Sequence, residues 1–360
     1  MQVGPDQQPP AVRARRYAHA PPIHASRDHV EAGDGPTPPL IGTSPMMERA
    51  RQLVEEYATI ADPVAVVGPT GTGKGLVARL LHARSGRPGR LVHVPGGELV
   101  ETLYHKQLYG HAKGAYTGAY QDAPGAFQQA AGGTLFLDEL QLWSPAAQAA
   151  ILRAVEDGSI RPLGAHRDVF VDCRIIVGSN RPLEALASEG RLMEDLRYRL
   201  GDFAIELAGL AERRADIAVL AYHFLEDERR SAPTTTPLLF TAEALERLLA
   251  YDWPGNVREL RGAIRFAVVN AGGAERIGVE HLPLRVRTYP GDADAALLRE
   301  VTAWVFAECG RRRREAAWRL GVHPNTIDYR LRQHGRLIPR PRHNETGGPH
   351  EMGPPRARPL

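Results

Sequence analysis

The chain has 360 residues, 43% hydrophobic and 24% charged, which is enough for a sizeable core and about two or three domains. Its net charge is only +3, so charge alone indicates neither a nucleic acid nor an anionic membrane as a partner. Two cysteines exclude a disulfide framework, and no apolar run approaches the roughly 20 residues of a membrane span. We therefore predict a soluble protein of the cytoplasm that has no membrane partner.

Residues 1–40 predict a disordered leader. They contain eight prolines and almost no periodic apolar pattern, so they cannot bury enough surface to offset the entropy of ordering. A leader of this length is too short for a receiver or ligand-binding domain. We therefore expect regulation to come from a separate protein, from expression level or from assembly.

Residues 41–210 predict an α/β domain. Apolar residues return at helical spacing after Ile41 and are followed by the short apolar run 64–67, which predicts a helix and then a buried strand. Such alternation is typical of a parallel sheet with helices on both faces. Further strands are predicted at 91–94, 134–137 and 171–177, and helices at 75–83 and 145–155.

The segment GPTGTGKG at 68–75 predicts a phosphate-binding loop, because it follows a buried strand and opens a helix. Glycines let backbone N–H groups converge on phosphate oxygens, and Lys74 reaches the β- and γ-phosphates. The pattern departs from the usual one at Gly75, which offers no hydroxyl to Mg²⁺. The ATP-binding residues predicted here are Gly68, Pro69, Thr70, Gly71, Thr72, Gly73, Lys74 and Gly75.

The second half of the predicted site is the strand 134–137, which ends in Asp138 and Glu139. Ligands of open α/β sheets bind at this carboxyl edge of the sheet. Asp138 would hold Mg²⁺ directly or through water, and Glu139 would orient and polarise the attacking water. Either acid alone could be a solvated strand end, but the pair together with Lys74 predicts ATP hydrolysis.

A helical second lobe is predicted from about Ala211 to Leu284, without strands. It is interrupted at 231–237 and by the turn at 253–256. A basic module follows: residues 309–342 carry ten arginines and two acids, a net +8, so the remaining chain sums to +3 minus 8, or −5.

Three helices at 294–308, 314–320 and 324–334, with a turn at Gly321, predict a helix-turn-helix, followed by a disordered tail at 339–360. The third helix would face double-stranded DNA, and Arg311 to Arg314 would contact phosphates. The alternative is an arginine-rich helical pair that serves dimer contacts only. The predicted DNA-binding residues are Asn325, Thr326, Asp328, Arg330 and Arg332.

Residues 110–119, GHAKGAYTGA, resemble one family, the bacterial enhancer-binding proteins, which are AAA+ activators of sigma-54 RNA polymerase. The family's GAFTGA loop corresponds to GAYTGA here. Glycines and small residues around one aromatic ring and one β-branched hydroxyl suit an exposed contact tip, the alternative being a turn with a buried Tyr116. The resemblance spans about 41–284 and includes GAF at 125–127, GGTLFLDEL at 132–140, EDLRYRL at 194–200, ERRADI at 212–217 and WPGNVREL at 253–260.

The resemblance implies an AAA+ P-loop NTPase fold, with the ATPase subdomain at 41–210, an α-helical lid at 211–287 and the helix-turn-helix domain at 288–338. It implies that Asn180 senses the γ-phosphate, that Arg199 is an arginine finger reaching the neighbouring subunit's ATP, and that Arg258 couples nucleotide to the lid. An intersubunit site requires a homo-oligomer, typically a hexameric ring. Each arginine could instead form a surface ion pair. The implied sigma-54 contacts are Gly114, Ala115, Tyr116, Thr117, Gly118 and Ala119.

Two positions depart from the family pattern and put nucleotide sensing and the hydrolysis rate in doubt. Pro95 stands where the family usually has an asparagine that switches the catalytic glutamate. Met193 stands where the family has a first trans-acting arginine, for which Arg197 is a candidate substitute. The C-terminal module resembles the Fis-type helix-turn-helix of enhancer-binding proteins, and HPNTIDYRL at 323–331 resembles equally the purine-catabolism regulator family.

These observations predict a transcription activator that binds upstream DNA and uses ATP hydrolysis to remodel the closed sigma-54 RNA polymerase complex. The alternative is a DNA-binding regulator in which ATP binding controls oligomerisation without sigma-54 remodelling. A non-transcriptional AAA+ remodeller or helicase is a third reading, which the helix-turn-helix disfavours.

Overall fold

The computed structural model describes residues 37–98, 104–231 and 239–334. The chain divides into two units, residues 1–297 and 298–360, and each is described by itself. The predicted leader, apart from residues 37–40, and the predicted tail lie outside the described residues.

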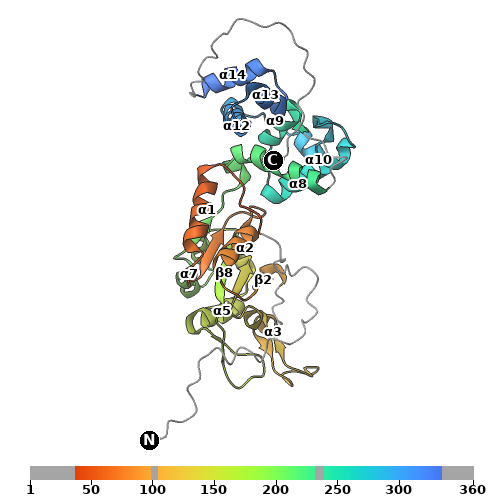
Figure 1. Ribbon diagram of the computed structural model, residues 1–360. Coiled ribbons are helices and arrows are strands. Elements are labelled where there is room, and N and C mark those ends of the chain that lie inside the picture. The colour runs from red at the N-terminus through yellow and green to blue at the C-terminus, as the bar shows by residue number, and fades with distance from the viewer. Residues whose placement is uncertain (1–36, 99–103, 232–238, 335–360) are drawn as a thin grey trace, which may run out of the picture. The chain divides into compact units, whose positions relative to one another are not determined.

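A parallel sheet forms the core of the first unit, with five strands among the described residues (Figure 1). The strand order is β2-β5-β8-β1-β9, and each neighbouring pair is parallel. The strands are β1 (Val64–Val67), β2 (Leu91–Pro95), β5 (Thr134–Asp138), β8 (Arg174–Ser179) and β9 (Ala204–Glu206).

The predicted parallel α/β architecture is confirmed, and β1 has the predicted bounds. The strand predicted at 171–177 is displaced, because it begins only at Arg174. Residues 171–173 form a tight turn instead, in which the Cys173 N–H donates to the Val171 carbonyl at 3.1 Å. An apolar run shows that a segment is buried, but it does not show where the ladder of the sheet begins.

Helices cover both faces of the sheet (Figure 1). Val66 and Phe136 point to one face, where they pack against α1 (Pro45–Tyr57) and α2 (Lys74–Arg84). Because side chains alternate along a strand, Val67 and Leu137 point to the other face. The helices packed there are α3 (Tyr104–Tyr109), α4 (Ala126–Gln129), α5 (Pro145–Asp157), α6 (Leu183–Ser188) and α7 (Glu194–Leu200).

Helices α1 and α5 begin with the same local signal, a serine N-cap followed by proline. Ser44 accepts a hydrogen bond from the Met47 N–H, and Ser144 accepts one from the Ala147 N–H. Proline at the first helical position has no N–H to leave unpaired, which makes this a favourable start. Helix α5 ends at Asp157 and is capped by Gly158, whose φ of 60° is left-handed.

Two antiparallel ribbons and three 3-10 helices complete the α/β subdomain in the described ranges. Leu163, between β6 and β7, accepts from the Ala112 N–H and donates to the Gly110 carbonyl, which joins the two ribbons. The ribbons are β3 (Gly110–His111) with β4 (Ala123–Pro124), and β6 (Ser159–Ile160) with β7 (Val169–Phe170). The 3-10 helices are η3 (Gly96–Glu98), η4 (Leu140–Leu142) and η5 (Leu210–Glu212).

The second lobe is mainly helical, as expected, but the prediction that it lacks strands is wrong. β10 (Leu239–Phe240) and β11 (Arg276–Ile277) form a two-stranded parallel sheet. Runs of two residues are too short to show a strand pattern in the sequence. The helices are α8 (Ala215–Ser231), α9 (Ala242–Ala250), α10 (Asn256–Ala271) and α11 (Leu284–Arg287), with the 3-10 helix η6 (Val279–His281).

The described C-terminal segment ends with α12 (Ala295–Glu308), α13 (Arg313–Leu320) and α14 (Pro324–Gln333). Gly321, with φ of 66°, makes the predicted turn between α13 and α14, which confirms the helix-turn-helix. Leu320 and Ile327 are among the apolar residues buried by this module.

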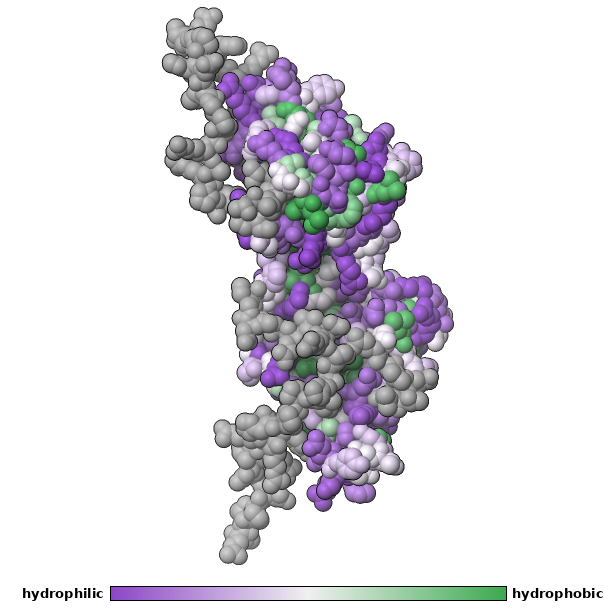
Figure 2. Space-filling model, turned by 90° about the vertical axis from the view of Figure 1, so that its right-hand side faces the viewer, coloured by the Kyte–Doolittle hydropathy of each residue, from purple (hydrophilic) through white to green (hydrophobic). Residues whose placement is uncertain are grey.

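None of the helices that the structure describes is long and apolar enough to span a membrane. The face in Figure 2 is mainly hydrophilic, and its hydrophobic residues form small separate groups.

Candidate functional site

The loop at 68–73 joins β1 to α2 and is held by β8, by its own backbone and by the second lobe. The Gly68 N–H donates to the Ser179 carbonyl at 3.0 Å, and the Thr72 hydroxyl donates to the Pro69 carbonyl at 2.8 Å. Gly71 has φ of 82°, and a Cβ there would clash with the Gly255 carbonyl. Glycine is therefore required at 71 both by the backbone angle and by the close approach of the second lobe.

Lys74 opens α2 and is buried. Its ammonium donates to the carbonyls of Gly68 at 2.8 Å and Pro69 at 3.3 Å, so the side chain folds back over the loop. Burial lowers the pKa of Lys74, while the charges of Asp138 and Glu139 oppose that shift. The predicted lysine and both predicted acids therefore lie within electrostatic reach of one another.

Asp138 is the last residue of β5, and Glu139 follows it at the carboxyl edge of the sheet. The Asp138 Oδ1 accepts a hydrogen bond from the Glu139 N–H at 2.8 Å. Burial acts to raise the pKa of Asp138, but His93, the Glu139 N–H and Lys74 together bring it below its usual value. Glu139 has φ of 55° and ψ of 46°, a left-handed conformation that is strained for this residue.

Asn180 lies at the carboxyl edge of the sheet, and Arg258 lies next to the phosphate loop. Asn180 directly follows β8, and its Oδ1 is buried without a hydrogen-bond partner. Arg258 is in the first turns of α10, and its backbone N–H donates to the Gly71 carbonyl at 3.2 Å. The Arg258 side chain is exposed and acts on Lys74 electrostatically. The fold thus gathers these predicted nucleotide-site residues around one edge of the sheet.

A residue that sequence reasoning missed fixes the second lobe against the loop. Asn256 is buried, and its Oδ1 accepts from the Leu210 N–H at 2.8 Å while its Nδ2 donates to the Thr70 carbonyl at 2.9 Å. Its left-handed φ of 51° could have been suspected from the WPGN turn, because asparagine tolerates that conformation.

The predicted arginine finger lies apart from these residues within one chain. Arg199 is on α7, with an exposed side chain whose Nε lies 3.3 Å from Glu156 Oε1 on α5. Arg197 is more buried, stacked on Tyr198 at 3.9 Å and paired with Glu194 at 2.9 Å. Met193 packs against the core of the α/β subdomain. Of the two arginines, Arg199 has the more exposed guanidinium.

The GAYTGA segment is a compact turn carried by the β3/β4 ribbon. The Gly114 N–H donates to the Ala119 carbonyl at 2.8 Å, and Gly114 and Gly118 have φ of 82° and 99°. Tyr116, Thr117 and Gly118 are exposed, so the alternative of a buried Tyr116 does not hold. Ala119 is buried and Ala115 is half-buried.

Tyr116 is nevertheless held by its neighbours. Its ring lies 5.0 Å from that of His111, and the Lys106 ammonium is 5.1 Å from its centroid. Tyr120 lies directly after the motif, is 87% exposed, and is not among the predicted contacts. Its place beside an exposed loop tip was the available signal.

Helix α14 places the predicted DNA-binding residues unequally. Asn325 and Arg332 are exposed, while Thr326 and Arg330 are half-buried. Asp328 accepts a hydrogen bond from Arg313 of α13 at 2.6 Å, so its carboxylate is paired within the module. Tyr329, which is 62% exposed, shares a helix face with Asn325 and was missed although the i, i+4 spacing indicates it.

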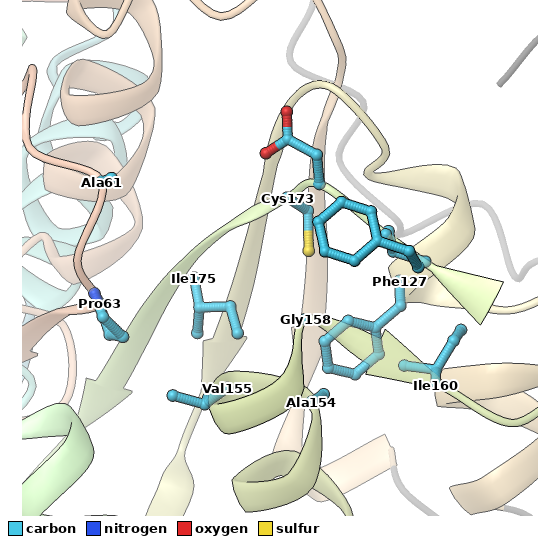
Figure 3. Close-up of a pocket in the computed structure, with 12 residues that line it drawn as sticks. Ala61, Pro63, Phe127, Ala154, Val155, Gly158, Ile160, Cys173 and Ile175 are labelled. Carbon is cyan, nitrogen blue, oxygen red and sulfur yellow. The ribbon is translucent and has the colours of Figure 1, made fainter. Parts of the chain in front are cut away.

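A hollow of about 180 Å³ lies at the opposite, amino edge of the sheet (Figure 3). Pro63 and Cys173, which directly precede β1 and β8, line it together with apolar residues of α4 and α5. The sulfur of Cys173 is directed toward the hollow (Figure 3). None of the predicted site residues lines this hollow.

Three family models match consecutive parts of the chain. The Sigma-54 interaction domain matches residues 40–206, and the AAA+ ATPase lid domain matches 211–296. The PucR C-terminal helix-turn-helix domain matches 301–344. Of the two helix-turn-helix types that the C-terminal sequence resembles, the purine-catabolism regulator type is the one matched.

Similar proteins are transcriptional regulators. The transcriptional regulatory protein ZraR of Salmonella typhimurium is 40% identical over 302 residues, which are 80% of this chain and 67% of the relative. The Nif-specific regulatory protein of Azotobacter vinelandii is 37% identical over 304 residues, 81% of this chain and 58% of the relative. Crystal structures of NtrX from Brucella abortus with ADP and with ATP align with a TM-score of 0.63 and 28% identity. Each alignment covers 83% of this chain, with 69% of NtrX in the ADP complex and 70% in the ATP complex.

Proposed function

Because this chain belongs to the family of sigma-54-dependent transcriptional regulators, we propose that it couples ATP hydrolysis to remodelling of the closed sigma-54 RNA polymerase complex. The observation that carries the proposal is the gathering of Lys74, Asp138 and Glu139 around one sheet edge in a subdomain that also presents the exposed GAYTGA loop. Upstream DNA would be bound by α13 and α14.

The phosphate loop fits a nucleotide. Glycine at 73 leaves open space where a Cβ would stand, and the loop precedes the N-terminus of α2. Backbone N–H groups of 70–75 would bind the phosphates, and the Lys74 ammonium would turn from the carbonyls of Gly68 and Pro69 to the β- and γ-phosphates. The buried, unpartnered Oδ1 of Asn180 would accept from the attacking water, and its Nδ2 would donate to a γ-phosphate oxygen.

The strand edge fits a magnesium ion that accompanies the nucleotide. Asp138 remains ionised because its pKa is lowered, and its carboxylate oxygen is a donor that Mg²⁺ prefers. When bound, Mg²⁺ neutralises phosphate charge. Glu139 would then take the role of orienting and polarising the attacking water, with its left-handed backbone aiming the carboxylate.

Assembly would complete the site. An exposed arginine that is paired with a surface carboxylate is easily recruited, because such a pair is worth only about 0–1 kcal/mol. Arg199 of one subunit would stabilise transition-state charge on the neighbour's ATP, and Arg258 would report the nucleotide to the second lobe. We accordingly propose a homo-oligomeric, hexameric ring.

The first test is ATP hydrolysis as a function of protein concentration. Turnover per chain should rise with concentration and should vanish in Glu139→Ala and Arg199→Ala. Arg84→Ala is the matched control, because Arg84 is also an exposed arginine paired with a glutamate. Turnover that does not depend on concentration would contradict an intersubunit site.

The second test separates the motor from its coupling. Thr117→Ala should abolish opening of a sigma-54 promoter while leaving ATPase activity and DNA binding nearly intact, and Thr117→Ser is the conservative control. Retained promoter opening would contradict the proposed role of the loop. ATP-dependent assembly without turnover would favour the alternative regulator, which Pro95 and the core-packed Met193 support.

A further inference from the structure

His93 is fixed beside the proposed cation ligand by strand register and ring stacking. It stands on β2 opposite Phe136 of β5, two residues before Pro95, which is opposite Asp138. The imidazole stacks on the Phe136 ring, with centroids 4.9 Å apart and an interplanar angle of 18°. This stacking brings its Nε2 to 3.7 Å from the Asp138 Oδ2.

The Nε2 atom of His93 is buried and has no hydrogen-bond partner. A separation of 3.7 Å is longer than a hydrogen bond, so the imidazole is aimed at the carboxylate without yet being satisfied by it. Buried polar atoms without partners are uncommon in folded proteins, and each one calls for a reason. A small rotation of the Asp138 side chain would bring the two groups into contact.

The other carboxylate oxygen of Asp138 is already constrained. Oδ1 accepts from the Glu139 N–H at 2.8 Å and lies over Gly178, where a Cβ would clash with it. The orientation of the carboxylate about this fixed oxygen is therefore set by what Oδ2 meets. The side chain that faces Oδ2 is that of His93, with its Nε2 at 3.7 Å.

The orientation of the Asp138 carboxylate is more important in this chain because position 75 is a glycine. A phosphate-binding loop usually has serine or threonine after its lysine, and that hydroxyl binds Mg²⁺. Gly75 has none, and its Cβ position lies 4.0 Å from the same Phe136 ring on which His93 stacks. The glycine, the aromatic ring, the histidine and the aspartate thus adjoin one another, and Asp138 is left as the ligand on the protein side.

We infer that His93 is a positioning residue that orients the Asp138 carboxylate toward the nucleotide's divalent cation, and so offsets the hydroxyl missing at Gly75. The inference rests on the proposed ATPase, since it concerns the cation that accompanies ATP. It assigns His93 no contact with the nucleotide. Residues that hold a ligating carboxylate typically change metal affinity 10- to 100-fold when removed.

The test is binding of a fluorescent ADP analogue by the full chain, first in EDTA and then with increasing Mg²⁺. His93→Phe keeps an aromatic ring to stack on Phe136 but removes the nitrogen. The Mg²⁺ concentration that gives half of the full enhancement should rise about 10-fold in this variant, while the affinity in EDTA stays within about twofold. His105→Phe, a change at an exposed histidine of α3, should shift neither value.

A rescue variant distinguishes positioning from general damage. Gly75→Ser has room for its side chain and supplies the hydroxyl, so adding it to His93→Phe should return the Mg²⁺ requirement to within about threefold of the wild-type value. Failure of this rescue overturns the inference, as does a Mg²⁺ requirement that His93→Phe leaves unchanged or an equal loss of affinity in EDTA. A wild-type chain that binds no ADP analogue under any condition would instead overturn the proposed ATPase.

Discussion

The two edges of the central sheet both carry charged side chains, but they use them differently. At the amino edge, buried Arg174 donates to the carbonyls of Tyr57 and Ala58 at the end of α1, and Arg87 donates to the Gly133 carbonyl at 2.8 Å. At the carboxyl edge, His93 and Asn180 have buried polar atoms without hydrogen-bond partners, and these face the proposed nucleotide site. The Nε of Arg174 also lacks a partner, but both of its terminal nitrogens are bonded to backbone. The amino-edge arginines donate hydrogen bonds to backbone carbonyls and so stabilise the fold. The polar groups at the carboxyl edge are available to bind a ligand.

The strain in the backbone follows the same division. Glu139, at the carboxyl edge, is held in a left-handed conformation, whereas Arg174 and its neighbours in β8 are regular strand. Strained residues persist where the surroundings enforce them, and they cluster at functional sites. Substitutions at the amino edge should therefore change stability, and those at the carboxyl edge should change nucleotide chemistry.

The largest effect on stability is expected at the amino edge. Arg174→Met should lower the free energy of unfolding by about 3 kcal/mol, because it leaves two carbonyls at the end of α1 without their buried donor. Urea denaturation measures this loss. Arg84→Met removes an exposed ion pair with Glu55 and should cost less than about 1 kcal/mol. A folded Arg174→Met chain with more than a few-fold weaker ADP binding would break the division between the edges.

At the carboxyl edge, the phosphate loop should be most sensitive where the second lobe touches it. Gly71→Ala and Gly73→Ala both place a side chain at positive φ, which costs about 1–2 kcal/mol. At Gly71 the new Cβ also meets the Gly255 carbonyl, whereas at Gly73 it meets open space. We expect ADP affinity to fall about 100-fold in Gly71→Ala and about 10-fold in Gly73→Ala. Equal losses would show that the approach of the second lobe does not matter for binding.

Glu139 allows strain and chemistry to be separated. Glu139→Gly should raise the free energy of unfolding by about 0.5–1 kcal/mol, because glycine adopts the left-handed conformation without the steric cost. ATP turnover should be lost. Glu139→Gln should lose turnover as well but gain no stability, since it keeps the side chain and the strain. Thermal unfolding and ATPase assays on the two variants test this, and a Glu139→Gly chain no more stable than Glu139→Gln would refute stored strain.

The sequence shows which residues form the site at the carboxyl edge better than it shows which residues they contact. Lys74, Asp138 and Glu139 follow from a local pattern, since ligands of open α/β sheets bind where the buried strands end. His93 could not be found that way, because its role depends on the register of β2 against β5 and on a ring stack between separate strands. The local sequence pattern determines which face of the sheet a side chain points to. The register between strands determines which side chains it contacts.

The same reasoning explains the other differences. The short β10/β11 pair has too few residues to show a period, and the pairing of Asp328 with Arg313 depends on how α13 and α14 cross. The helix-turn-helix itself was accessible from the sequence, because Gly321 and the apolar residues on either side mark it locally.

The effect expected at the hollow of the amino edge is absent at neutral pH and appears only at high pH. Burial raises the pKa of the Cys173 thiol to about 12, whereas in an unfolded chain the thiol ionises at about 8.5. Between these values the folded chain keeps a proton that the unfolded chain has lost. The free energy of unfolding must therefore fall as pH rises above about 9, and below about 8 this contribution is fully present.

The measurement is urea denaturation of wild type and Cys173→Ala at about pH 7.0, 8.5 and 9.5, values that lie below, at and above the pKa of the thiol in the unfolded chain. The alanine variant should differ from wild type by a constant amount up to about pH 8, since the only change there is the lost packing of the sulfur. By about pH 9.5 the wild type should have lost about 1 kcal/mol more than the variant, because each pH unit of unequal protonation is worth about 1.4 kcal/mol. Parallel pH dependence in the two proteins would mean that Cys173 ionises while folded. The amino-edge hollow would then admit water, and the contrast between the two edges would rest on the backbone bonds of Arg174 and Arg87.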